Sequence, residues 1–124
     1  MNEQEQFSLI KRAKSFTHAG RGVLIFIKTT HNAWVHILAL MMTVSLGFYF
    51  GITQTEWMFL VFAGGFVFVC EAFNTALEID IDLTSPEYHP YARDTKDVAA
   101  GAVLLSACTA VVVGMIIFIP YLLM

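Results

Sequence analysis

The stretch WMFLVFAGGFVFVCEAFNTALEIDID, residues 57–82, is uncharged in its first half and acidic in its second half. Residues 57–70 carry no charge, and the remainder brings several acidic and amide side chains. At about 100° per residue, these polar side chains fall on one helical face about 100° wide. Ionisable groups at membrane depth are costly, so they normally face a bundle interior or a water-filled cavity and mark function. We call this set the polar face: Glu71, Asn74, Thr75, Glu78 and Asp82.

Two more apolar segments flank this stretch. The chain of 124 residues is 57% hydrophobic and 14% charged, whereas a small soluble domain is charged at about a quarter of its positions. A membrane-spanning helix needs roughly 20 apolar residues, and a spanning segment must be helical because its backbone groups find no partners in lipid. The composition therefore predicts a single all-α integral membrane domain over residues 1–124. Its spans are expected at about 34–52, 57–79 and 98–120.

The basic residues predict the orientation of these spans. Five of the seven Lys and Arg side chains precede the first span, and the other two lie between the second and third. The first connection, GITQTE at residues 51–56, has none. By the positive-inside rule, the N-terminus and the region 80–97 are cytoplasmic.

The segment before the first span, about residues 7–30, has a different pattern. Its basic side chains at Lys11, Lys14, His18 and Arg21 share one face by 3.6-residue periodicity, and its apolar residues lie mostly elsewhere. This pattern predicts an amphipathic helix on the cytoplasmic membrane surface. Two readings stay open: an anchor held by anionic lipid, or a basic face that also contacts an anionic substrate.

The third span carries small residues at every fourth position. Small side chains in this register let helices approach closely in lipid. We therefore expect a tight bundle, and a three-span chain this short is expected to oligomerise to enclose its polar groups. The small residues are Ala102, Ser106, Ala110 and Gly114.

The polar groups favour phosphoryl transfer at a membrane surface. Carboxylates bind Mg²⁺ or act as general bases, and Lys or Arg neutralises phosphate. The stretch SPEYHPYARDTKD, residues 85–97, supplies both kinds of group. No G-x-x-x-x-G-K-[ST] loop occurs, and AGRGV at 19–23 has no preceding strand, which excludes a soluble-type nucleotide fold. Taken alone, these patterns indicate a membrane protein with a cytoplasm-facing acidic site.

Three ordered motifs resemble a known family. E-x-x-N-[ST]-A-x-E-x-x-x-D at 71–82, EYH at 87–89 and KD-x-x-x-x-A-V-L at 96–104 resemble the prokaryotic diacylglycerol kinases, which include the undecaprenol kinases. The resemblance covers nearly the whole chain, and KDVAAGAVLL is closer to the undecaprenol kinase branch. It implies a homotrimer in the bacterial cytoplasmic membrane, with no nucleic-acid partner. The enzyme would move the γ-phosphate of MgATP to the hydroxyl of a lipid alcohol, diacylglycerol or undecaprenol.

The resemblance also implies roles for individual residues. Glu71 would be the general base on the lipid hydroxyl, Asn74 would support it from one turn away, and Glu78 would bind the metal. Substrate-binding positions would be Glu71, His36 and Ala100. ATP-binding positions would be Lys11, Arg12, His18, Glu78, Glu87, Tyr88, His89, Lys96 and Asp97.

Thr30 departs from the family pattern. Members usually carry a Glu there as a second metal ligand, whereas Asn32 and His36 match the common pattern around it. A Thr hydroxyl can ligate Mg²⁺, but without charge. His18 also lies where an aromatic residue is common.

Three functional hypotheses follow. The first is a lipid kinase. The second is a catalytically impaired member with a lipid-binding, structural or regulatory role, which the departure at Thr30 motivates. The third is a small transporter or channel with Glu71 as a proton or cation site, but such a protein does not need the phosphate-neutralising residues at 87–97.

Overall fold

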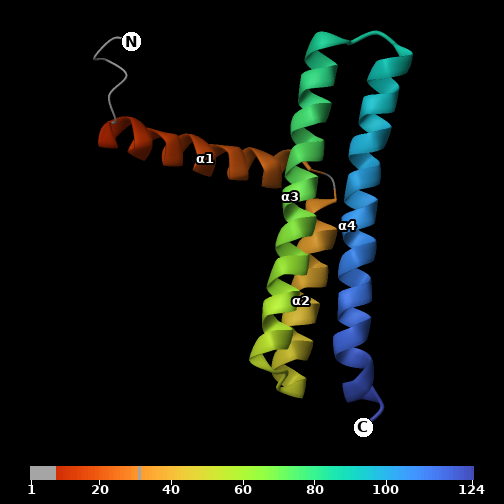
Figure 1. Ribbon diagram of the computed structural model, residues 1–124. Helices are drawn as coiled ribbons and strands as arrows, with labels where there is room; N and C mark the ends of the chain where they lie inside the picture. The colour runs from red at the N-terminus through yellow and green to blue at the C-terminus, as the bar shows by residue number, and fades with distance from the viewer. Residues whose placement is uncertain (1–7, 31) are drawn as a thin grey trace.

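Four helices make up the part of the chain that the computed structural model describes, residues 8–30 and 32–124. Figure 1 shows α3 and α4 side by side along their length, with α2 packed beside the first half of α3. The helix α1 leaves the bundle across the direction of the other three and touches it only at its C-terminal end. The helices are α1 (Leu9–Thr29), α2 (Ala33–Phe50), α3 (Gln54–Thr84) and α4 (Pro90–Leu122).

Each of the three predicted spans coincides with a helix, α2, α3 or α4, that is long and apolar enough to cross a membrane. Two of them extend beyond the predicted bounds. The 31 residues of α3 make a helix about 46 Å long, and the apolar core of a bilayer is about 30 Å thick. The helix therefore continues past residue 79 through the polar face to Thr84, and α4 already begins at Pro90 rather than near 98.

A left-handed glycine and a capping box fix the turn between α2 and α3. Gly51 ends α2 in the left-handed conformation, with φ of 62°, which glycine adopts without steric cost. Thr53 then caps α3: its hydroxyl accepts from the Glu56 backbone N–H at 3.2 Å, and the Glu56 carboxylate accepts from the Thr53 N–H at 3.0 Å. The same carboxylate accepts the Tyr121 hydroxyl at 2.6 Å, which ties this end of the bundle to α4.

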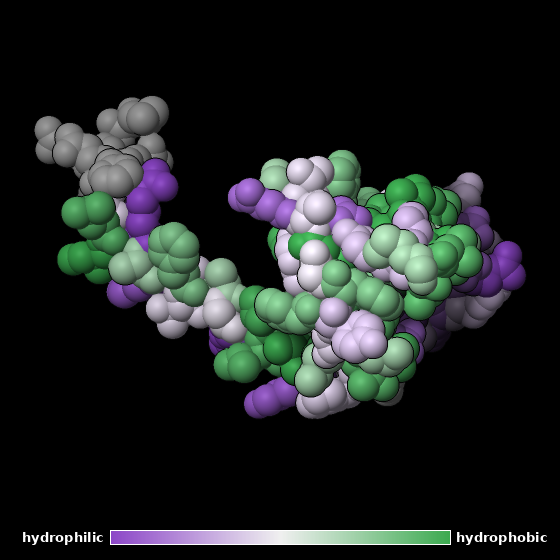
Figure 2. Space-filling view, turned by 90° about the horizontal axis from the view of Figure 1, so that it is seen from below, coloured by the Kyte–Doolittle hydropathy of each residue, from purple (hydrophilic) through white to green (hydrophobic). Residues whose placement is uncertain are grey.

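The bundle is apolar outside as well as inside. Its buried core at the α2–α3 turn is small, consisting of Ile52, Leu60, Ile117 and Phe118. Large apolar side chains cover much of the outer surface, and Phe62, for example, is 76% exposed. Figure 2 views the bundle from the end where the C-terminus lies and shows green apolar side chains around most of the visible bundle. Such a surface suits a lipid environment.

The helix α1 has no buried residue. Its basic and apolar side chains are both exposed in a single chain, so its amphipathic placement on the membrane surface stays a prediction. Among the predicted small residues of α4, Ser106 is fully buried and donates to the Val103 carbonyl at 2.7 Å. Homotrimer formation likewise stays a prediction.

Candidate functional site

Glu71 is the most buried carboxyl group of the described residues. The residue is 2% exposed and lies on α3 directly after the uncharged segment 57–70. Its Oε1 lies 2.7 Å from Nε2 of His36 on α2. Burying a charged group without a hydrogen-bond partner is costly, so this contact is what makes the position of Glu71 tolerable.

Aromatic rings pack around His36. The Phe68 ring meets the imidazole edge to face, with centroids 6.4 Å apart. Phe26, near the end of α1, packs on Phe68 in the same manner at 6.5 Å. Three helices therefore converge at the His36–Glu71 pair.

The hydroxyl of Thr30 lies at the end of α1, where it meets α3. Its Oγ1 is 2.6 Å from Oγ1 of Thr75, a buried side chain one turn beyond Glu71. Thr30 also caps α1, with its N–H bonded to the Phe26 carbonyl at 3.0 Å. Thr30, the position expected to hold a metal ion, therefore offers a hydroxyl that is paired with the Thr75 hydroxyl. Thr75 lies one turn before Glu78 on α3.

Asn74 and Glu78 form the next contact along the polar face. The Asn74 amide nitrogen donates to Glu78 Oε1 at 3.3 Å. A carboxylate only accepts, so this contact directs the Asn74 carbonyl oxygen away from it. That oxygen, Oδ1, is buried and has no hydrogen-bond partner in the described part of the chain. A buried orphan acceptor beside a carboxylate is a position where a water, a hydroxyl or a cation would bind.

Asp82 and Lys96 join α3 and α4 next to the loop that connects them. Lys96 Nζ donates to Asp82 Oδ1 at 2.6 Å. Lys96 precedes the apolar part of α4, and this hydrogen bond raises the pKa of its ammonium group above the ordinary value. The expected nucleotide-binding residue Lys96 is therefore held beside the polar face, and Asp82, which the resemblance left without a role, is what holds it there.

The loop between α3 and α4 presents three exposed side chains expected to bind ATP: Glu87, Tyr88 and His89. His89 caps α4, and its Nδ1 accepts from the Tyr91 backbone N–H at 3.1 Å. The Arg93 guanidinium carbon lies 6.0 Å from the Tyr88 ring centroid. Cationic and aromatic groups suited to phosphate and base contacts therefore lie together.

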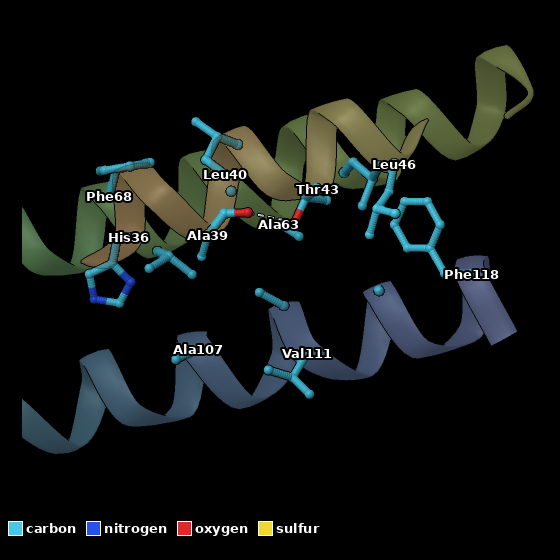
Figure 3. A pocket seen from close by; sticks show the side chains of 15 residues that line it. His36, Ala39, Leu40, Thr43, Leu46, Ala63, Phe68, Ala107, Val111 and Phe118 are labelled. Atoms are coloured by element: carbon cyan, nitrogen blue, oxygen red, sulfur yellow. Dashed lines mark hydrogen bonds between the residues drawn. The ribbon is translucent and has the colours of Figure 1, made fainter. Parts of the chain in front are cut away.

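An apolar groove begins at His36 and runs along the bundle between α2 and α4, with α3 as its floor (Figure 3). Its volume is 270 Å³. The far end is lined by Leu46 and Phe118. Small side chains leave the space open: Ala39, Ala63, Gly64, Ala107, Ala110 and Gly114.

Other predicted site residues lie apart from this centre. Lys11, Arg12 and His18 are exposed on α1, which Figure 1 shows extending sideways from the bundle, below the level of the α3–α4 loop. Asp97 and Ala100 are exposed on α4. Sequence reasoning missed Phe68, because one Phe among 11 in the chain carries no distinguishing signal.

The fold and the site together define a class: a helical protein with three helices able to span a membrane and a buried carboxyl group whose histidine partner heads an apolar groove. Residues 17–118 match the family model described as prokaryotic diacylglycerol kinase. The chain is 38% identical over 109 residues to the undecaprenol kinase of Bacillus subtilis (strain 168), covering 88% of this chain and 89% of that protein. It is 36% identical over 110 residues to the diacylglycerol kinase of Synechocystis sp., covering 88% of this chain and 63% of that one. The chain belongs to the prokaryotic diacylglycerol kinase family, a family of lipid kinases.

Proposed function

We propose that this protein transfers the γ-phosphate of ATP to the hydroxyl of a membrane lipid alcohol, with undecaprenol preferred over diacylglycerol. The observation that carries the proposal is the buried Glu71 carboxyl group, paired with His36 at the head of an apolar groove. The KDVAAGAVLL motif and the similarity to an undecaprenol kinase favour the polyprenol. We further propose a homotrimer in the bacterial cytoplasmic membrane with the site on the cytoplasmic side.

The groove suits the chain of such a lipid. From His36 to Leu46 along α2 it extends about 15 Å, roughly one leaflet of a bilayer. A lipid chain in the groove would bring its hydroxyl to the His36–Glu71 end. Glu71 would then accept the hydroxyl proton while the oxygen attacks the γ-phosphorus and ADP leaves.

The part of the polar face that follows Glu71 along α3 would bind the nucleotide and its metal ion. The polar face offers several oxygen ligands within about one turn of Glu78: its own carboxylate, the orphan Asn74 Oδ1 and the Thr30–Thr75 hydroxyl pair. This set fits Mg²⁺, which is commonly held by one or two carboxylates together with substrate phosphates. Bound there, Mg²⁺ would neutralise charge on the β- and γ-phosphates.

The basic residues complete the nucleotide site. Lys96, held by Asp82, and Arg93 would neutralise further phosphate charge, and Tyr88 and His89 would contact the base or ribose. Lys11 and Arg12 of α1 would reach a nucleotide only if α1 lies near this loop in the assembled protein. Transfer therefore depends mainly on positioning and charge neutralisation.

The test is a phosphorylation assay. Purified protein in detergent receives γ-labelled ATP and Mg²⁺, with undecaprenol and diacylglycerol offered side by side. The wild type should label the polyprenol more, and Glu71→Gln should lower the rate by about 10²- to 10⁴-fold, the usual contribution of a general base. Asp80→Asn is the matched control, since Asp80 is an exposed carboxylate of α3 off the polar face.

Two outcomes would refute parts of the proposal. Wild-type rates in Glu71→Gln would remove Glu71 from the role of base. A folded wild-type protein that labels neither lipid, with other divalent metals also tried, would favour the impaired-member hypothesis and direct attention to Thr30.

A further inference from the structure

His36 is the one side chain in the described part of the protein that bonds to the Glu71 carboxyl group. The contact is short, at 2.7 Å, and both groups are shielded, with side-chain exposures of 3% for Glu71 and 20% for His36. A buried carboxyl group with a single polar partner takes its orientation from that partner. His36 therefore decides which way the Glu71 oxygens point.

The chemistry of the pair indicates which nitrogen of the His36 imidazole carries the proton. An ionised carboxylate only accepts hydrogen bonds, so the contact to an ionised Glu71 requires a proton on Nε2 of His36. This N–H occupies Oε1 of Glu71. Oε2 is left to accept a proton from another group.

The imidazole ring is itself fixed by packing. Phe68 contacts it at an interplanar angle of 72°, and Phe26 supports Phe68 at 85°. The ring also forms the head of the apolar groove, where Figure 3 shows it beyond Ala39 at the end opposite Phe118. The imidazole thus lines the groove and also contacts the Glu71 carboxyl group.

We propose that His36 is a positioning residue for Glu71: its Nε2–H holds Oε1 and turns Oε2 toward a hydroxyl at the head of the groove. The inference rests on the proposed lipid kinase function, and it assigns His36 a role other than the lipid contact that the resemblance implies. In the transfer step a bond forms between the lipid oxygen and the γ-phosphorus, and the bond from that phosphorus to the ADP oxygen breaks. The hydroxyl proton passes to Oε2, and His36 keeps its own proton.

Two substitutions test this role kinetically. His36→Leu removes the donor, whereas His36→Gln keeps an amide N–H of similar reach. We expect His36→Leu to lower kcat by about 10²-fold, the scale of a misplaced reacting group, with the KM for ATP unchanged. We expect His36→Gln to recover most of the lost rate. Unchanged kcat in His36→Leu, equal losses of kcat in both variants, or an effect on the KM for lipid alone would overturn the proposal.

A spectroscopic readout is independent of activity. In ¹⁵N-histidine-labelled protein the His36 ring signals, assigned by their loss in His36→Gln, should show protonation at Nε2. Glu71→Ala should remove the downfield shift that a hydrogen bond to a carboxylate gives the Nε2–H proton. A ring protonated only at Nδ1 in the wild type would overturn the proposal. If the wild type labels no lipid, the proposed function fails and the positioning role fails with it, while these signals still report whether the pair forms.

Discussion

The close approach of α2 to Trp57 offers a quantitative test of the fold. A Cβ added to Gly47 would lie 2.5 Å from Cη2, 2.8 Å from Cζ2 and 3.1 Å from Cζ3 of the Trp57 ring. Real Cβ atoms essentially never come within 3.0 Å of such neighbours. The ring also packs against Phe48, with centroids 4.9 Å apart, so moving it would disturb this contact.

The expected cost of Gly47→Ala combines two effects. Overpacking costs about 1–3 kcal/mol, whereas replacing Gly by Ala inside a helix gains about 1 kcal/mol. Gly65→Ala separates them, because a Cβ on Gly65 meets nothing within 4 Å and only the helical gain applies. The free energy of unfolding should therefore be about 1–3 kcal/mol lower for Gly47→Ala than for Gly65→Ala.

The measurement is reversible unfolding of the purified protein in mixed micelles, by denaturing-detergent titration or steric trapping. Trp57→Leu supplies the second half of a double-mutant cycle, since it removes the ring atoms that the new Cβ would meet. In that background Gly47→Ala should lose most of its penalty. Equal stability of Gly47→Ala and Gly65→Ala, or an unchanged penalty without the Trp57 ring, would refute the packing argument.

Three further predictions concern contacts along the bundle. Tyr121→Phe removes the hydroxyl donor to Glu56 and should lower the free energy of unfolding in the same assay; no loss would show that the contact is not maintained. Lys96→Met should raise the KM for ATP, while the free energy of unfolding stays close to that of the wild type because the bond to Asp82 is exposed; an unchanged KM would remove Lys96 from the nucleotide site. Thr30→Glu should lower the Mg²⁺ concentration needed for half-maximal lipid phosphorylation, with Thr30→Val as the control, and an equal or higher requirement would place Thr30 away from the metal.

Much of the fold could be predicted from the sequence, because hydrophobicity and charge report directly on lipid and water. The uncharged stretch at 57–70 and the apolar stretch at 98–119 both fall within helices that can cross a membrane. The helix ends could not be located in the same way. Polar side chains such as Asp82 interrupt the apolar pattern, but the backbone stays helical beyond them until capping and loop residues such as Ser85 and His89 intervene.

The candidate site was predictable on α3 and much less so across helices. A helical wheel places Glu71, Asn74 and Glu78 on one face because the spacing of a helix is regular. The partners of that face depend on how the other helices pack. The contacts of His36 with Glu71 and of Thr30 with Thr75 join residues 35 and 45 positions apart, and no local pattern encodes them.

The polar face is buried at its Glu71 end and exposed at its Glu78 end, an arrangement that would suit the two proposed substrates of opposite polarity. Glu71 and Thr75 are buried, Asn74 is half-buried, and Glu78 is exposed. From Glu71 to Glu78 the helix rises about 10 Å, enough to pass from the hydrocarbon toward water. A lipid hydroxyl can approach the first end along the groove, and a nucleotide can approach the second from solution. Substitutions near Glu71 should therefore alter lipid-dependent kinetics, and those near Glu78 should alter the dependence on ATP and Mg²⁺.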